Sequence, residues 1–181
     1  MKLKINPGVI WITGLSGAGK TTVAEKLYNQ LIKKYSNIKI LDGDILRKKL
    51  NIKKTKKSFT YSSRKKVGIK YSKICKTFEN KGFLVIISVM ALIEDVYKWN
   101  KKSFKNYLDV YLKVPIKILK RRDPKEIYKR FYEKKIFNFQ GLDLAFDEPE
   151  KPFLKISWRK GINSNIIVKK LKKKILNHKF N

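Results

Sequence analysis

The sequence has only one cysteine, Cys75, among its 181 residues. A single cysteine excludes a disulfide bond within the chain and any metal site built from several thiolates. We expect Cys75 to be a buried helix residue rather than a catalytic one. Long apolar runs are also lacking, because no stretch approaches the ~18 consecutive residues of a membrane span. The segment before Pro7 has no apolar signal-peptide core. We therefore expect a cytoplasmic protein with no membrane partner.

Acidic residues are scarce as well. There are 14 of them against 45 lysines and arginines, which gives a formal net charge of +31. Such a charge suggests nucleic-acid binding, because lysine-rich surfaces bind phosphate backbones through counterion release. The lysines are scattered through nearly every segment, however, and the one basic run, 169–174, is typical of the solvated face of a helix. No helix-turn-helix, zinc-finger or RNP-like pattern is present. Small anionic substrates account for the charge, and we expect no specific nucleic-acid partner.

The length and the 43% hydrophobic content predict one domain over residues 1–181. Apolar, β-rich runs alternate with stretches of helical periodicity, which is typical of an α/β fold with a parallel sheet flanked by helices. The predicted strands are residues 9–13, 38–41, 83–89 and 108–112. The predicted helices are residues 21–32, 64–80, one that begins near Pro115 and one that begins at Asn163 or Ser164.

Residues 121–152 have a different character. They are rich in charged, aromatic and turn residues and show no clear period. We interpret this segment as a lid and substrate loop rather than as a second domain.

The spacing G-x-x-x-x-G-K-[ST] is met by Gly14, Gly19, Lys20 and Thr21, between a predicted strand and a predicted helix. Glycines let backbone N–H groups turn toward phosphate oxygens, the lysine neutralises the β and γ charges, and the threonine hydroxyl suits Mg²⁺. The motif predicts a P-loop NTPase fold and a nucleoside-triphosphate site, with Thr21 as the metal ligand. The residues predicted to contact the nucleotide here are Gly14, Ser16, Gly17, Ala18, Gly19, Lys20, Thr21 and Thr22.

An acidic pair, Asp42 and Asp44, follows the second predicted strand, and Arg47 lies one helical turn beyond Asp44. A carboxylate there can organise the water around Mg²⁺ or accept a proton from the acceptor hydroxyl, and an arginine can hold an anionic substrate. The plain structural alternative for Asp44 is a helix N-cap. No Asn-Lys-x-Asp tetrad for guanine recognition is present, so the pattern favours a small-molecule kinase over a GTPase.

Taken together, these motifs resemble those of adenylylsulfate (APS) kinases, which use ATP to phosphorylate the 3′-hydroxyl of a nucleotide that carries sulfate on its 5′-phosphate. The resemblance spans nearly the whole chain. It is carried by the segments 14–22, 41–47, 120–128, 139–143 and 146–152.

The resemblance implies ATP and Mg²⁺ as cofactors and assigns further residues. Phe59 and Phe139 would stack on the acceptor base, and without the resemblance both would be interpreted as core residues. The resemblance further implies acceptor binding by Asp42, Arg47, Arg64 and Lys125, and nucleotide contact by Arg121. It implies catalysis by Lys20, Asp44 and Arg122. Either lid arginine, Arg121 or Arg122, can stabilise the transferring phosphoryl group. Members of the family are often dimers, so a homodimer is expected.

The departures from the family pattern gather in the acceptor pocket. Val67 stands where an asparagine is common, Ile69 stands where an arginine is common, and residues 90–94 replace an Ile-Ser-Pro-Tyr-Arg segment. The loss of polar groups changes which nucleotide fits a pocket. The pattern is similar to that of capsule-associated relatives that act on cytidine diphosphoramidate. The acceptor is therefore APS or cytidine diphosphoramidate, and a nucleic-acid-binding P-loop ATPase is the alternative function.

Overall fold

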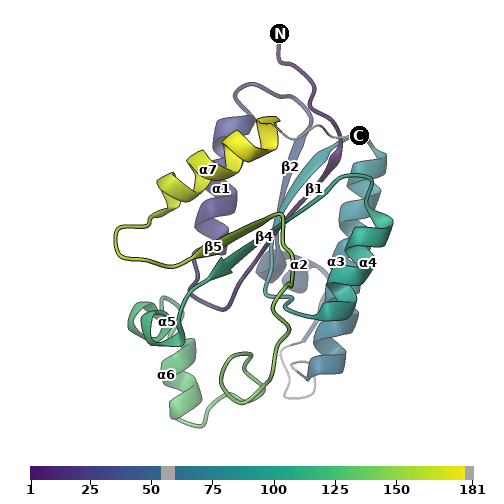
Figure 1. The fold of residues 1–181 in the computed structure, drawn as a ribbon. Coiled ribbons are helices and arrows are strands. Elements are labelled where there is room, and N and C mark those ends of the chain that lie inside the picture. Colours follow the sequence, from purple (N-terminus) through teal and green to yellow (C-terminus); the bar gives the residue numbers. More distant parts are fainter. Residues whose placement is uncertain (54–59, 178–181) are drawn as a thin grey trace.

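The structure of the chain is a computed structural model that describes residues 1–53 and 60–177. Its strands are β1 (Gly8–Thr13), β2 (Ile38–Asp42), β3 (Leu84–Ser88), β4 (Tyr107–Lys113) and β5 (Leu154–Ser157). Its helices are α1 (Lys20–Leu31), α2 (Gly43–Lys49), α3 (Tyr61–Asn80), α4 (Glu94–Ser103), α5 (Ile116–Arg122), α6 (Ile127–Tyr132) and α7 (Ser164–Asn177). Figure 1 shows the sheet between two groups of helices, as the sequence predicts.

The five strands form one sheet in the order β2-β3-β1-β4-β5, and every neighbouring pair is parallel. Parallel strands need crossover connections, which α1, α3 and α5 help to supply. The chain leaves β1 toward β2 and β3 and later returns to β4 on the other side of β1. The loop after β1 therefore lies where the strand order reverses, which is the usual ligand position in open α/β sheets.

Each face of the sheet buries its own apolar cluster. Alternate residues of β1 point to opposite faces, so Ile10 and Ile12 pack with α1 and α7, whereas Val9 and Trp11 pack with α3 and α4. Cys75 is fully buried in the second cluster, as predicted, and burial raises the pKa of its thiol.

The structure adds elements that the sequence pattern does not reveal. The segment 121–152 contains the short helix α6, which begins beside the Asp123 carboxylate because that group accepts hydrogen bonds from the first backbone N–H groups of the helix. Helix α4 was not predicted either. Strand β5 escapes detection because it has four residues, lies at the sheet edge and buries only Ile156.

The structure also corrects the predicted start of one helix and the alternative role given to Asp44. Helix α3 begins at Tyr61, three residues earlier than predicted, because the Thr60 side chain accepts a hydrogen bond from the Ser63 N–H. The N-cap of α2 is Asp42 and not Asp44, since the Asp42 carboxylate accepts hydrogen bonds from the N–H groups of Asp44 and Ile45.

Helices α3 and α4 approach each other closely at Gly68. A Cβ atom at this position would lie only 2.7 Å from Cγ2 of Val96. Replacing a mid-helix glycine by alanine ordinarily stabilises a helix by about 1 kcal/mol. Here we predict that Gly68→Ala lowers the free energy of unfolding by ~1–3 kcal/mol in urea denaturation, because the β-branched Val96 cannot move aside easily. Val96→Ala in the same background should restore part of that loss, and additive effects would contradict the prediction.

Candidate active site

The loop between β1 and α1 has the backbone conformation that a phosphate site needs. Gly17 and Gly19 have φ values of 77° and 89°, in the left-handed region that favours glycine. Gly19 is the N-cap of α1 and gives it no side-chain hydrogen bond, and a Cβ at Gly19 would meet no atom within 4 Å. Open space in front of the positive end of α1 fits a phosphate group.

Lys20, at the start of α1, folds back over this loop. Its Nζ donates a hydrogen bond to the Leu15 carbonyl oxygen at 2.9 Å. Desolvation and the nearby Lys125 lower the pKa of Lys20 to about 8, although Asp44 and Asp42 act in the opposite direction. The cation is therefore held in a site where a phosphate would be its natural counter-ion.

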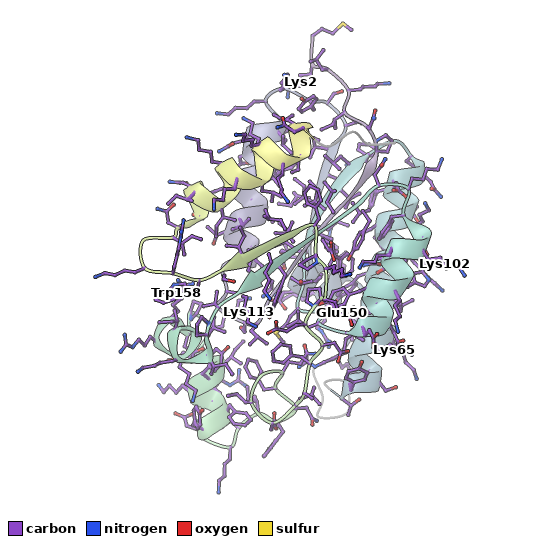
Figure 2. The ribbon with its side chains drawn as sticks, in the orientation of Figure 1. Lys2, Lys65, Lys102, Lys113, Glu150 and Trp158 are labelled. Atoms are coloured by element: carbon purple, nitrogen blue, oxygen red, sulfur yellow. The ribbon has the colours of Figure 1, made fainter. Side chains whose placement is uncertain are left out.

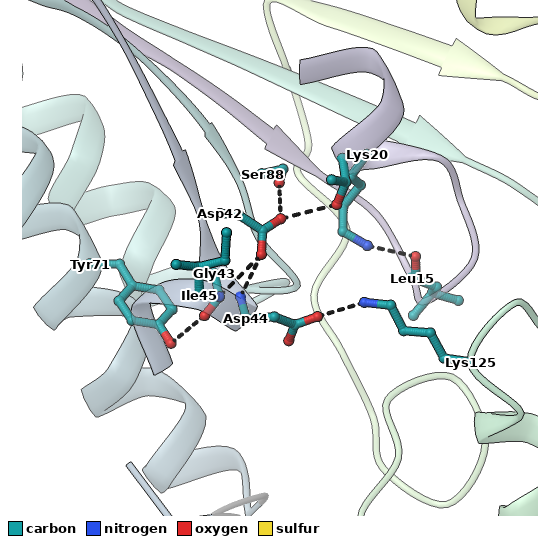
Figure 3. Close-up of polar contacts among 10 residues, drawn as sticks. Leu15, Lys20, Asp42, Gly43, Asp44, Ile45, Tyr71, Ser88 and Lys125 are labelled. Carbon is teal, nitrogen blue, oxygen red and sulfur yellow. Dashed lines mark hydrogen bonds and ion pairs between the residues drawn. The ribbon is translucent and has the colours of Figure 1, made fainter. Parts of the chain in front are cut away.

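The Asp42 carboxylate connects the loop to the sheet (Figure 3). Its Oδ2 accepts hydrogen bonds from the Thr21 hydroxyl at 3.0 Å and from the Ser88 hydroxyl at 2.7 Å. Its Oδ1 caps α2. Thr21 and Asp42 are thus brought together from α1 and β2, and a hydroxyl beside a carboxylate suits the hard oxygen coordination of Mg²⁺.

No group of three or more histidine, cysteine, aspartate or glutamate side chains in the described residues could hold a metal ion. A magnesium ion at a nucleotide site is held largely by phosphates and water and needs only one or two protein oxygens. Thr21 and the neighbouring Asp42 are the residues that would hold it.

The lid reaches the site through two contacts. The Lys125 Nζ lies 2.6 Å from Oδ2 of Asp44, which places the predicted acceptor-binding lysine against the predicted catalytic carboxylate. The buried Tyr128 of α6 donates a hydrogen bond to the Ser16 carbonyl oxygen at 3.1 Å. Tyr128 ends the segment 120–128 of the family resemblance but was not among the predicted site residues, because a single tyrosine has no functional pattern of its own.

A pocket of about 160 Å³ opens beside the loop, between α1 and the start of α7. Its lining includes Gly19, Thr22, Arg122, Ile156, Trp158 and Asn163. Arg122 and the indole of Trp158 offer a cation and a flat apolar surface at the mouth of the phosphate loop, which suits the nucleoside part of a nucleotide. Trp158 projects from the loop between β5 and α7 in Figure 2. Arg121 is exposed one residue earlier on α5 and does not line the pocket.

Two predicted acceptor-binding arginines lie together and are buried. Arg47 of α2 is 8% exposed and Arg64 of α3 is 7% exposed. Desolvation, and next the charge of Arg47, lower the pKa of Arg64 to about 10. An Arg64 Nη2 hydrogen bond to the Asn138 carbonyl oxygen, at 2.9 Å, links α3 to the substrate loop. Two adjacent buried cations favour an anionic ligand.

Of the predicted aromatic pair, Phe139 lies among the residues that the structure describes. Phe139 is 5% exposed, and its ring contacts Tyr128 edge to face with the centroids 5.2 Å apart. In this structure Phe139 therefore packs as a core residue, and its contact with a base stays a prediction. Phe59 lies outside the described residues.

The segment that departs from the family pattern is packed against the core. Leu92 and Ile93 are fully buried, and Met90 and Val67 are partly buried against the two apolar clusters. Glu94 does not face the site, because its carboxylate is largely exposed and pairs with Lys98 at 2.7 Å.

The comparisons with known proteins agree with this geometry. The sequence model described as adenylylsulphate kinase matches residues 6–157, which is most of the chain. The chain belongs to the adenylylsulphate kinase family. It is 35% identical to the cytidine diphosphoramidate kinase of Campylobacter jejuni over 172 residues, which are 93% of this chain and 99% of that protein. It is 37% identical to the adenylyl-sulfate kinase of Clostridium acetobutylicum over 151 residues, which are 83% of this chain and 74% of that one.

Solved structures support the same fold for this kinase. The APS kinase of Mycobacterium tuberculosis superposes with a TM-score of 0.84 at 23% identity, covering 95% of this chain and 99% of its own. Family membership makes the chain an ATP-dependent phosphotransferase with ATP and Mg²⁺ as cofactors. Among the residues that the structure describes, no helix is long and apolar enough to cross a bilayer.

The lowered pKa of Lys20 predicts a proton linkage. At about pH 8.5 a large fraction of Lys20 is neutral in the free kinase, and nearby phosphates favour its charged form. ATP binding should therefore take up a proton at about pH 8.5 and much less at about pH 6.5, where Lys20 is already charged. Isothermal titration calorimetry in buffers of different ionisation enthalpy measures this uptake. Lys20→Ala should abolish it, and equal uptake by that variant would contradict the assignment.

The Asp44–Lys125 ion pair predicts a separation of activity from stability. Both side chains are more than half exposed, so the pair contributes at most ~1 kcal/mol to folding. We expect Lys125→Gln to leave the melting temperature nearly unchanged and to lower kcat/KM by about tenfold or more, because the lid loses a cation at the reacting groups. Lys129→Gln is the matched control, since Lys129 pairs only with the lid residue Glu126 among the described ion pairs. Equal activities of the two variants would contradict a role for Lys125.

Proposed function

We propose that this kinase transfers the γ-phosphoryl group of ATP to the ribose 3′-hydroxyl of a small anionic nucleotide. The observation that carries the proposal is the placement of α2 beside the phosphate loop. Its N-cap Asp42 contacts Thr21, its first turn carries Asp44, and its last turn carries the buried Arg47. One short helix would thus connect the donor site to the acceptor site.

On the donor side, backbone N–H groups of residues 14–19 and the Lys20 cation would hold the β- and γ-phosphates, and Thr21 would be a ligand of Mg²⁺. A magnesium ion held there would supply positive charge to offset the charge that develops on the phosphates. Arg122, or Arg121 beside it, would stabilise the transferring group when the lid closes. Asp44 would orient the acceptor hydroxyl and take its proton, or would organise the water around the metal.

On the acceptor side, Arg47 and Arg64 would bind the anionic end of the nucleotide, and Phe139 with Phe59 would stack on its base. Lys125 would move from Asp44 to an anion of either substrate. Two acceptors fit this description. The end-to-end match to the Campylobacter jejuni kinase and the apolar Val67 and Met90 favour cytidine diphosphoramidate. The family model and the clostridial relative favour APS.

A nucleic-acid-binding ATPase is not favoured by the comparisons, since the relatives named above are small-nucleotide kinases. The positive charge is also dispersed. In Figure 2 the labelled Lys2 lies near the N-terminus, away from Lys65 and Lys102 on the neighbouring helices α3 and α4. The cytoplasmic location and the homodimer expected from the family resemblance stay predictions, and sedimentation velocity measures the second.

The test presents the purified protein with Mg-ATP and, separately, APS or cytidine diphosphoramidate, and follows ADP formation. We expect one acceptor to support turnover and Lys20→Ala to abolish it, with the fold kept intact, because phosphoryl transfer depends on charge stabilisation by the loop. Lys26→Ala, one and a half turns along α1 and hydrogen-bonded to Asn165, is the matched control and should stay active. Turnover with neither acceptor, or ATP hydrolysis that requires DNA or RNA, would overturn the proposal.

A further inference from the structure

Asp147 lies in the loop between α6 and β5, and none of the roles assigned above involves it. Its Oδ2 accepts a hydrogen bond from the Tyr61 hydroxyl at 2.6 Å and another from the Glu94 N–H at 2.7 Å. Tyr61 is the first residue of α3 and Glu94 is the first residue of α4. A single carboxylate oxygen from the loop therefore joins the amino ends of two helices.

Backbone contacts fix the position of this carboxylate. The Asp147 N–H donates to the Leu92 carbonyl oxygen at 3.1 Å, and the same oxygen accepts a hydrogen bond from the Gln140 side chain at 3.2 Å. Leu92 and Gln140 are fully buried. The loop is thus attached to the buried segment before α4 at two points, so Asp147 is not a freely moving surface side chain.

The first two turns of α3 also carry a buried acceptor-binding candidate. Arg64 lies three residues after Tyr61, and its guanidinium donates to the Asn138 carbonyl oxygen at the other end of the same loop. Helix α3 is consequently tied to the loop at Tyr61 and at Arg64. The hydrogen bond to Asp147 also raises the pKa of Tyr61 to about 12, so the phenol keeps its donor proton at neutral pH.

We propose that Asp147 is a positioning residue for the acceptor nucleotide, which acts through Tyr61 to hold the first turns of α3, and with them Arg64, against the substrate loop. This inference rests on the proposed function, because it assumes that the acceptor lies between Arg64 and that loop. None of these hydrogen bonds involves a residue of the phosphate loop. Loss of the Asp147 contacts should therefore affect the acceptor and leave ATP binding unchanged.

The structure provides a matched control between the same two helices. Lys65 of α3 and Asp95 of α4 form an ion pair at 2.6 Å, with both side chains about half exposed. Asp95 follows Glu94 in the sequence, and its ion pair with Lys65 does not involve the substrate loop. Asp95→Asn thus removes the same charge and a contact between α3 and α4 while it leaves the loop attachment in place.

The first test compares steady-state kinetics of Tyr61→Phe, Asp147→Ala and Asp95→Asn, with the acceptor that the wild-type protein phosphorylates. We expect the first two variants to raise the acceptor KM by about tenfold, since each removes a hydrogen bond to a charged group, and to leave the ATP KM within about twofold. Asp95→Asn should behave as wild type. An unchanged acceptor KM, or parallel increases in both KM values, would overturn the proposal.

The double variant Tyr61→Phe/Asp147→Ala tests whether the two residues act through one contact. We expect its acceptor KM to equal that of the more affected single variant rather than the product of both effects. Tyr61→Phe removes only the hydroxyl and keeps the aromatic ring. Its acceptor KM therefore tests the proposal even where an Asp147 variant folds poorly. Multiplicative effects would show that the contact does not couple the two residues.

Hydrogen exchange provides a readout that needs no acceptor. In Asp147→Ala, peptides that cover residues 60–66 and 138–148 should exchange faster, and peptides from α1 should exchange at the wild-type rate. Unchanged exchange would overturn the inference. Failure of the wild-type protein to phosphorylate either acceptor would instead overturn the proposed function, so the two failures are distinguishable.

Discussion

The Asp42 carboxylate is the group through which the two halves of the site are aligned. It accepts hydrogen bonds from Thr21 of α1 and Ser88 of β3, and it caps α2 with its other oxygen. Hydrogen bonds to an ionised acceptor contribute roughly 1.5–3 kcal/mol each, and three elements share this one acceptor. Because α2 begins at this carboxylate, the positions of Asp44 and Arg47 depend on the same group that accepts a hydrogen bond from Thr21, the proposed metal ligand.

The proposed donor and acceptor sides of the kinase are built in different ways. The donor side consists of a loop between a fully buried strand and a helix with four buried residues, so its geometry is fixed by the core of the sheet. The acceptor side is assembled from α2, α3 and the 138–148 loop, which are far apart in the chain and are joined by side-chain contacts such as Arg64 to Asn138. Substitutions can therefore change the acceptor without disturbing phosphate binding.

The sequence predicts the donor side well because its signals are local. Glycine spacing, an apolar strand before it and helical periodicity after it together fix the loop, and the structure confirms the parallel sheet that they imply. The longest apolar run, 83–89, is likewise found in the sheet as β3. The fold class and the phosphate loop thus follow from residues that are neighbours in the chain.

The parts that the sequence does not reveal depend on contacts between distant residues. Ser88 carries no motif, and Asp147 lies in the segment 146–152 of the family resemblance without a role of its own. Their hydrogen bonds to Asp42 and Tyr61 span 46 and 86 residues. Strand β5 is formed by pairing with β4 rather than by its own composition. Phe139 was assigned to a base by resemblance, and in this structure its ring is buried against Tyr128.

In the proposed reaction, both halves of the site meet at a ribose 3′-hydroxyl. The most direct measurement is the position of the new phosphate in the purified product, by correlation of the phosphorus and proton resonances in NMR spectra. The account predicts that the transferred phosphorus couples to the ribose H3′ proton of the acceptor. Coupling to H2′, or attachment of the phosphate at the 5′ end of the nucleotide, would contradict it.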